Sequence, residues 1–187
     1  MYRVTGYFKD QKVVRHFVDL YDARFLSVRE AEWLWNDASL RNLKEELSAL
    51  TRSLVHRDFQ STNVMVVGDR TVLIDYQGLR WGVPEYDLGS LLFDPYIHLT
   101  SVERRSLADF YYGLKVDSGS TQSRELFERQ LVRATTQRLM QAMGAFGFLG
   151  EVKGKTEFLE HIPVGRDRLI ELSKCEGGLA VLGELLG

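Results

Sequence analysis

Three polar side chains, Asp58, Asn63 and Asp75, have the types and spacing needed to hold a metal ion against phosphate. Each lies beside an apolar run with the character of a β-strand. Carboxylate and amide oxygens are hard ligands suited to Mg²⁺, which keeps several waters and binds phosphates through few protein groups. The sequence therefore predicts a Mg²⁺ and phosphate site, provided that the fold brings these residues together.

A short β-hairpin is predicted to do so. Residues 64–67 and 72–74 are β-branched or aliphatic, and residues 68–70 between them, Gly-Asp-Arg, are typical of a turn. Asn63 stands at the entrance of this hairpin and Asp75 at its exit. Because the two ends of a hairpin lie close together, we expect both side chains to converge on one point.

The order of these residues resembles a known catalytic core. The chain has His-Arg-Asp at 56–58, Asn at 63 after four intervening residues, and then a hairpin that ends in Ile-Asp at 74–75. This order is similar to the catalytic core of the kinase-like fold. Protein kinases usually have Asp-Phe-Gly at the second Asp, whereas this chain has Asp-Tyr-Gln-Gly at 75–78. Residues 82–91, GVPEYDLGSL, narrow the resemblance to the aminoglycoside phosphotransferase and choline kinase-like family. Residues 74–77, IDYQ, and residues 137–147 resemble the bacterial N-acetylmuramate/N-acetylglucosamine anomeric kinases within it, and the resemblance covers roughly residues 21–163.

The resemblance implies a role for each polar residue. Asp58 would be the catalytic group that accepts the proton of the attacking hydroxyl or orients it, and Asn63 and Asp75 would hold Mg²⁺ against the phosphates of ATP. His56 would brace the catalytic loop by hydrogen bonding. Asp87 would tie the start of its helix to that loop, since a carboxylate near a helix N-terminus accepts backbone N–H bonds. The alternative for Asp58 and Asn63 is an ordinary turn or cap.

The implied function is an ATP-dependent small-molecule phosphotransferase, in particular an amino-sugar kinase that transfers phosphate to a sugar hydroxyl. Its cofactor would be Mg²⁺, and its partners ATP and a small acceptor. Aminoglycosides are the alternative substrates, and a non-catalytic kinase-like remnant or partner-binding lobe is the alternative function. Asp94 and Tyr96 could line the acceptor pocket or could simply mark a surface helix end.

The fold class predicted is mainly α, an α+β chain equivalent to the C-terminal lobe of the kinase-like fold, with the hairpin carrying the catalytic loop. We expect residues 1–187 to form this single helical lobe without an N-terminal nucleotide-binding lobe. Residues 27–54 have a helical pattern of apolar residues, and the 26 or so before them cannot hold a five-stranded sheet. An isolated lobe would be slow or inactive, and its open surface could bind a partner or a second copy.

Helices are expected over six stretches of the chain. Residues 10–21 form a helix or a hairpin, and Ser39 could cap a second helix within residues 27–54. Pairing of Thr100 with Glu103 fits a capping box that opens a helix ending near Gly113. The remaining helices are expected at 85–93, 121–146 and 165–175. Residues 78–84 are expected to form a loop in which Trp81 is buried. The apolar face of the longest helix, 121–146, is expected to consist of Leu126, Phe127, Leu131, Ala134, Leu139 and Met143.

Composition excludes several other classes of protein. The net charge of −2 gives no basic field for nucleic acid, and no apolar run approaches the roughly 20 residues of a membrane span. The single cysteine, Cys175, cannot form a disulfide within the chain, so a reducing, cytoplasmic location is the default expectation. With 44% hydrophobic residues, the chain can bury a sizeable core.

Overall fold

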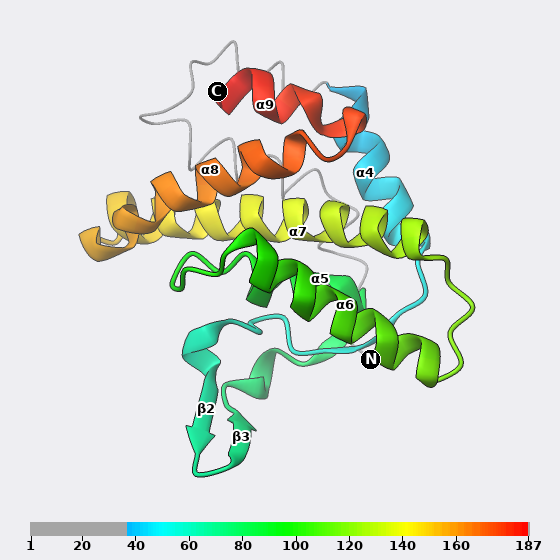
Figure 1. Cartoon of the computed structure of the whole chain (residues 1–187). Helices are drawn as coiled ribbons and strands as arrows, with labels where there is room; N and C mark the ends of the chain where they lie inside the picture. Colours follow the sequence, from blue (N-terminus) through cyan, green and yellow to red (C-terminus); the bar gives the residue numbers. More distant parts are fainter. Residues whose placement is uncertain (1–36, 187) are drawn as a thin grey trace. The chain divides into compact units, whose positions relative to one another are not determined.

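The computed structural model describes residues 37–186, and the helix or hairpin expected at 10–21 lies outside the described residues. The fold is mainly α with two small antiparallel sheets, in agreement with the predicted class (Figure 1). No helix in the described part of the chain is long and apolar enough to cross a membrane. In chain order the helices and strands are α4 (Ala38–Ala49), β1 (Ser53–Val55), β2 (Val64–Val67), β3 (Arg70–Leu73), β4 (Arg80–Gly82), α5 (Pro84–Leu92), α6 (Ser101–Asp117), α7 (Arg124–Gly147), α8 (Ile162–Ser173) and α9 (Ala180–Leu186).

Contacts within the chain divide it into two compact units. One unit is Thr51–Thr135, and among the described residues the other combines 37–50 with 136–186, so the boundary falls within α7. Short 3₁₀ turns η1 (Ser61–Asn63) and η2 (Tyr76–Gly78) belong to the first unit. The second contains a π-helical turn and two 3₁₀ turns, η3 (Phe148–Val152), η4 (Thr156–His161) and η5 (Gly177–Leu179). Each unit is described separately below.

The first sheet of the unit Thr51–Thr135 pairs β1 with β4. In register, Ser53 lies opposite Gly82 and Leu54 opposite Trp81. Two predictions were therefore wrong: the helix does not continue to Leu54, and the expected loop at 78–84 contains a strand. Trp81 is also not buried, with 60% of its surface exposed. Side chains alternate across a strand, so Val55 faces the interior while the Leu54–Trp81 pair faces outward.

The second sheet is the predicted hairpin, formed by β2 and β3. Val64 pairs with Leu73 and Val67 with Arg70, which leaves a two-residue turn at 68–69. Gly68 has a positive φ of 58°, as tight two-residue hairpin turns require. Arg70 and Thr71 therefore belong to β3, which starts before the predicted residue 72 and ends before Ile74. Figure 1 shows this ribbon projecting beyond α5, and every side chain of β3 is exposed.

The core of the same unit lies among α5, α6 and α7. Its buried members pack with Phe93, Tyr111 and Tyr112, and they are Leu88, Leu92, Ala108, Phe127 and Leu131. The predicted apolar face of α7 is confirmed at these last two positions and at Ala134, Leu139 and Met143, which are all buried. Leu126 is instead 45% exposed. Consecutive residues on a helix point about 100° apart, so Leu126 cannot share the direction of Phe127.

The ends of α5 and α6 follow from local chemistry. Pro84 occupies the first turn of α5, where its missing N–H leaves no bond unmade. The predicted capping box of α6 is confirmed, since Thr100 and Glu103 exchange both hydrogen bonds. Helix α6 does not end near Gly113 but continues to Asp117. Its last turn is held from outside, because Lys115 Nζ donates to Glu85 Oε1 at 2.6 Å and to Gln122 Oε1 at 2.7 Å.

The other unit contains α4, the second part of α7, α8 and α9. Asp37, not Ser39, caps α4, since Asp37 Oδ1 accepts the N–H groups of Ser39 (2.8 Å) and Leu40 (3.1 Å). Helix α8 starts at Ile162, earlier than expected, because Pro163 is suited to a first helical turn. The apolar tail of the chain forms α9. The fully buried side chains of this unit include Leu47, Met140, Met143, Leu169, Leu172, Leu179 and Leu182.

Candidate active site

The loop that leads from β1 to the hairpin carries the predicted catalytic residue, Asp58. Its backbone is folded on itself: Gln60 N–H donates to the carbonyl of Asp58 at 3.0 Å, and Asn63 N–H to the carbonyl of Gln60 at 2.9 Å. Asp58 is exposed, and its carboxylate makes no hydrogen bond to the described residues. A rigid loop thus presents a carboxylate that can accept a proton.

Asp87 of α5 fixes the start of this loop, as predicted. Its two oxygens accept the N–H groups of His56 (2.5 Å) and Arg57 (2.8 Å). Arg57 has a φ of 75°, a left-handed conformation that a non-glycine residue adopts only when its surroundings hold it there. The paired bonds from a single carboxylate supply that constraint immediately before Asp58.

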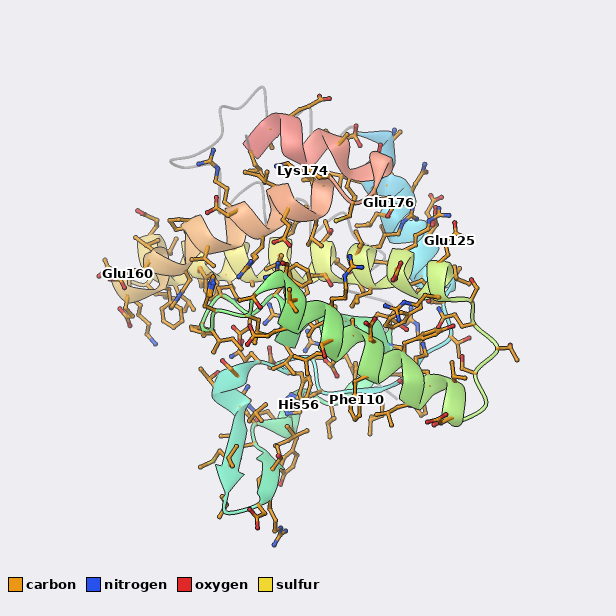
Figure 2. The ribbon with its side chains drawn as sticks, viewed as in Figure 1. His56, Phe110, Glu125, Glu160, Lys174 and Glu176 are labelled. Carbon is orange, nitrogen blue, oxygen red and sulfur yellow. The ribbon has the colours of Figure 1, made fainter. Side chains whose placement is uncertain are left out.

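His56 connects the loop to the far end of the hairpin. Its Nε2 lies 2.9 Å from the carbonyl oxygen of Ile74, which can only accept, so Nε2 carries the proton and donates it. The side chain is buried near the base of the hairpin (Figure 2), and its Nδ1 has no partner within the described region. The predicted bracing role is therefore confirmed, with the residue before Asp75 as the partner.

Asn63 and Asp75 stand at the two ends of the hairpin, as predicted. Ile74 N–H donates to the carbonyl of Asn63 at 3.0 Å, which joins the exit of β3 to the entrance of β2. Asn63 is buried, and its Nδ2 donates to the carbonyl of Asp58 at 2.8 Å. Asp75 has left-handed backbone angles, φ 63° and ψ 41°, and an exposed side chain. That the two side chains share one point stays a prediction.

Asp58 also lies close to the turn that follows Asp75. A side-chain carbon added at Gly78 would come within 3.4 Å of Asp58 Oδ2 and 3.3 Å of the carbonyl oxygen of His56. Glycine at this position leaves room for the Asp58 carboxylate beside η2. The segments before and after the hairpin therefore meet beside the Asp58 carboxylate.

The donor set at the hairpin base fits Mg²⁺ better than a metal that needs an all-protein cage. Within residues 37–186, no group of three or more His, Cys, Asp or Glu side chains could hold a metal ion. The Asn63 side-chain nitrogen donates to the carbonyl of Asp58, which leaves the side-chain oxygen of Asn63 as a ligand for a metal ion. The Asp75 carboxylate has no hydrogen bond among these residues. Two hard oxygens suit an ion such as Mg²⁺, which takes few protein ligands and retains water.

Comparison with known proteins agrees with this architecture. The phosphotransferase enzyme family model matches residues 5–138. The N-acetylmuramate/N-acetylglucosamine kinase of Neisseria meningitidis serogroup B is 30% identical over 159 residues, which are 82% of this chain. The chain spans about half, 46%, of the length of that protein. The chain belongs to the phosphotransferase enzyme family.

One buried contact of the loop was not foreseen from the sequence. Asp94, just beyond α5, accepts the N–H of Ser61 at 2.6 Å and is neither a surface residue nor an exposed helix end. The pattern Asp-Pro at 94–95 indicates a turn, as it does after many helices. That local pattern does not indicate that Asp94 would contact Ser61, 33 positions earlier in the chain. The contact depends on the tertiary fold.

Proposed function

We propose that this chain carries the acceptor- and metal-binding half of an ATP-dependent phosphotransferase that acts on a hydroxyl group of an amino sugar. The observation that supports this most directly is the exposed Asp58 carboxylate on a loop fixed by Asp87 and His56, beside the residues that enter and leave the hairpin. Phosphoryl transfer depends on positioning and charge more than on covalent chemistry, and this site is built for positioning.

Each residue has a separate part in the proposed reaction. Asp58 orients the acceptor hydroxyl and receives its proton as the oxygen bonds to the terminal phosphorus of ATP, while the bond from that phosphorus to ADP breaks and ADP leaves. Asn63 and Asp75 would hold Mg²⁺, and a bound Mg²⁺ neutralises the charge of the phosphate oxygens. His56 and Asp87 touch neither reactant; they hold the loop so that Asp58 stays at a fixed distance from the base of the hairpin.

An amino sugar is the acceptor proposed because the similar protein from Neisseria carries that substrate in its name. An aminoglycoside is the competing acceptor within the same family. A coupled assay for ADP with N-acetylglucosamine, N-acetylmuramate and kanamycin, each at equal concentration, would separate the two. Transfer to kanamycin alone would contradict the amino-sugar assignment and leave the phosphotransferase proposal in place.

The role of Asp58 can be tested against that of Asp75. Asp58→Asn is expected to lower kcat by about 10²–10⁴-fold, the usual contribution of a general base, while Mg²⁺–ATP binding is kept. Asp75→Asn should weaken Mg²⁺–ATP binding as well as the rate. Titration calorimetry beside the coupled assay measures both quantities, and Asp69→Asn, at the exposed tip of the same hairpin, is the matched control that should behave like the wild type.

Two results would contradict these assignments. Activity that survives in Asp58→Asn would remove its role as the base. A wild-type chain that does not bind Mg²⁺–ATP would contradict the proposed metal-binding function.

A second function, a non-catalytic partner-binding lobe, is favoured by the apolar side chains exposed around the hairpin. Val66 is 75% exposed, and Val67, Tyr76 and Leu79 are also open to solvent. Exposed apolar surface of this kind commonly marks a protein interface. Multi-angle light scattering tests it: a chain that stays monomeric across concentrations, and that transfers phosphate, would exclude self-association through this surface as its function.

A further inference from the structure

Asp94 is a buried carboxylate with both oxygens committed to backbone. It is 2% exposed, its Oδ2 accepts Ser61 N–H at 2.6 Å and its Oδ1 accepts Tyr96 N–H at 2.9 Å. A carboxylate is removed from water at a large free-energy penalty unless hydrogen bonds compensate. The bond to Tyr96 is local, whereas the bond to Ser61 crosses to the catalytic loop.

The position of Ser61 gives this bond its importance. Ser61 is the first residue of η1, the turn that ends at Asn63 and leads directly into β2. Asp87 holds the other end of the loop, at His56 and Arg57. The loop is therefore held by carboxylates at two separate points, with Asp58 between them.

We propose that Asp94 is a positioning residue that fixes the Ser61–Asn63 end of the loop, independently of the hold exerted by Asp87. It acts through the Ser61 amide and touches no reactant. By fixing η1, it sets where the Asn63 side chain lies relative to Asp58. The consequence for catalysis rests on the phosphotransferase function proposed above, whereas the anchoring itself can be measured without any activity.

The test uses amide hydrogen exchange of the full 187-residue chain, followed by NMR. Asp94→Asn keeps the shape of the side chain but replaces one acceptor oxygen by an NH₂ group, which must face a backbone N–H. Exchange at Ser61 and Asn63 should accelerate by at least about tenfold, the scale expected for a lost hydrogen bond to a charged group. Exchange at His56 and Arg57 should change by less than about twofold, and Asp87→Asn should give the reverse pattern.

A second variant removes the donor in place of the acceptor. Ser61→Pro deletes the single N–H that Asp94 accepts from the loop. Proline is tolerated there, because Ser61 starts a 3₁₀ turn and Gln60 before it is extended, with φ −123° and ψ 162°. If the bond between the Ser61 N–H and Asp94 holds the turn, the double variant Asp94→Asn with Ser61→Pro should show the same acceleration of exchange at Asn63 as either single variant. Independent effects would instead multiply the two accelerations.

The phosphotransfer assay then separates this proposal from the proposed function. Asp94→Asn should lower both the rate and the affinity for Mg²⁺–ATP, unlike Asp58→Asn, because Asn63 is the group displaced. Asp109 is an exposed carboxylate of α6 that pairs with Arg124, and Asp109→Asn is the control that should leave the rate and the affinity unchanged. Unaltered exchange at Ser61, or equal acceleration at His56 and Arg57, would overturn the proposal. A wild type that shows the expected exchange pattern but does not bind Mg²⁺–ATP would overturn only the proposed function.

Discussion

Arg57 and Asp75 are the non-glycine residues with positive φ in the described chain, and both adjoin the candidate site. For residues with a side chain, the left-handed conformation is disfavoured by roughly 1–2 kcal/mol. Hydrogen bonds on neighbouring groups offset this: Asp87 accepts the Arg57 amide, and Ile74, just before Asp75, uses both its N–H and its carbonyl. The strained backbone at the site is therefore held by hydrogen bonds to its amide and carbonyl groups, two of them from the side chains of Asp87 and His56.

Tyr111, close to Asp87, gives a prediction about alkaline pH. Burial, followed by the charges of Glu85 and Asp87, raises the pKa of Tyr111 to about 12. A phenol whose pKa is higher in the folded state stabilises the fold below the unfolded value of 10, and this stabilisation is lost as the pH rises towards 12. In an ultraviolet pH titration, the wild type should gain tyrosinate absorption that Tyr111→Phe lacks, and this additional absorption should appear near pH 12. A difference that develops near pH 10 would contradict the buried environment.

The site residues show how far sequence alone reaches. Asp58 and Asn63 are close in the chain, so their spacing was sufficient to predict that they lie in one loop, where Asn63 Nδ2 donates to the carbonyl of Asp58. The link from Asp87 to that loop was predicted from the position of this carboxylate near a helix N-terminus, and the structure supplies its donors, the His56 and Arg57 amides. The Asp94 contact was missed because its partner, Ser61, is distant in sequence and carries no side-chain signal.

At the scale of the elements, two glycines in neighbouring helices have opposite predicted effects. A side-chain carbon at Gly89 of α5 would meet Thr135 Oγ1 and lie 3.0 Å from Thr135 Cα. Thr135 is fully buried, and its hydroxyl donates to the carbonyl of Leu131 at 2.6 Å, so it has no room to move. Gly89→Ala should destabilise the fold by about 1–3 kcal/mol, as overpacking does.

Gly113→Ala is the matched control for that substitution. Gly113 also lies inside a helix, α6, but nothing lies within 4 Å of where its side chain would be. Alanine should therefore stabilise the fold by about 0.5–1 kcal/mol through helix propensity alone. Urea denaturation of both variants measures the two free energies of unfolding, and equal signs would show that α5 does not approach Thr135 so closely.

Element boundaries were predictable wherever a local signal ends a helix or a strand. The Thr100–Glu103 capping box was correct, and the mutual hydrogen bonds that form it also lower the pKa of Glu103. Gly113 was taken as a helix end, but the tertiary bond between Lys115 and Glu85 favours continuation. The β1–β4 sheet was missed for a similar reason, since each of its strands is short and finds its partner far along the chain.

For the whole molecule, the two compact units predict two local responses to core mutation. Phe127 and Leu169 are both fully buried, one in each unit. Replacing either by alanine should cost about 2–5 kcal/mol of stability. Because contacts cluster within a unit, peptide-level hydrogen exchange should rise most in the unit that carries the substitution. A uniform rise across residues 37–186 would show that the chain unfolds as one cooperative body.

The hairpin has a consequence for the handling of the protein in solution. Residues 61–68 contain no charged side chain and no proline, and four of them are the valines and methionine of β2. A β-prone, uncharged segment on an exposed two-stranded ribbon offers open backbone groups to an identical segment from another molecule. The strand that follows the loop carrying Asp58 is thus also the segment from which we expect aggregation to start. On heating, we expect the chain to precipitate through this strand before reversible unfolding is complete.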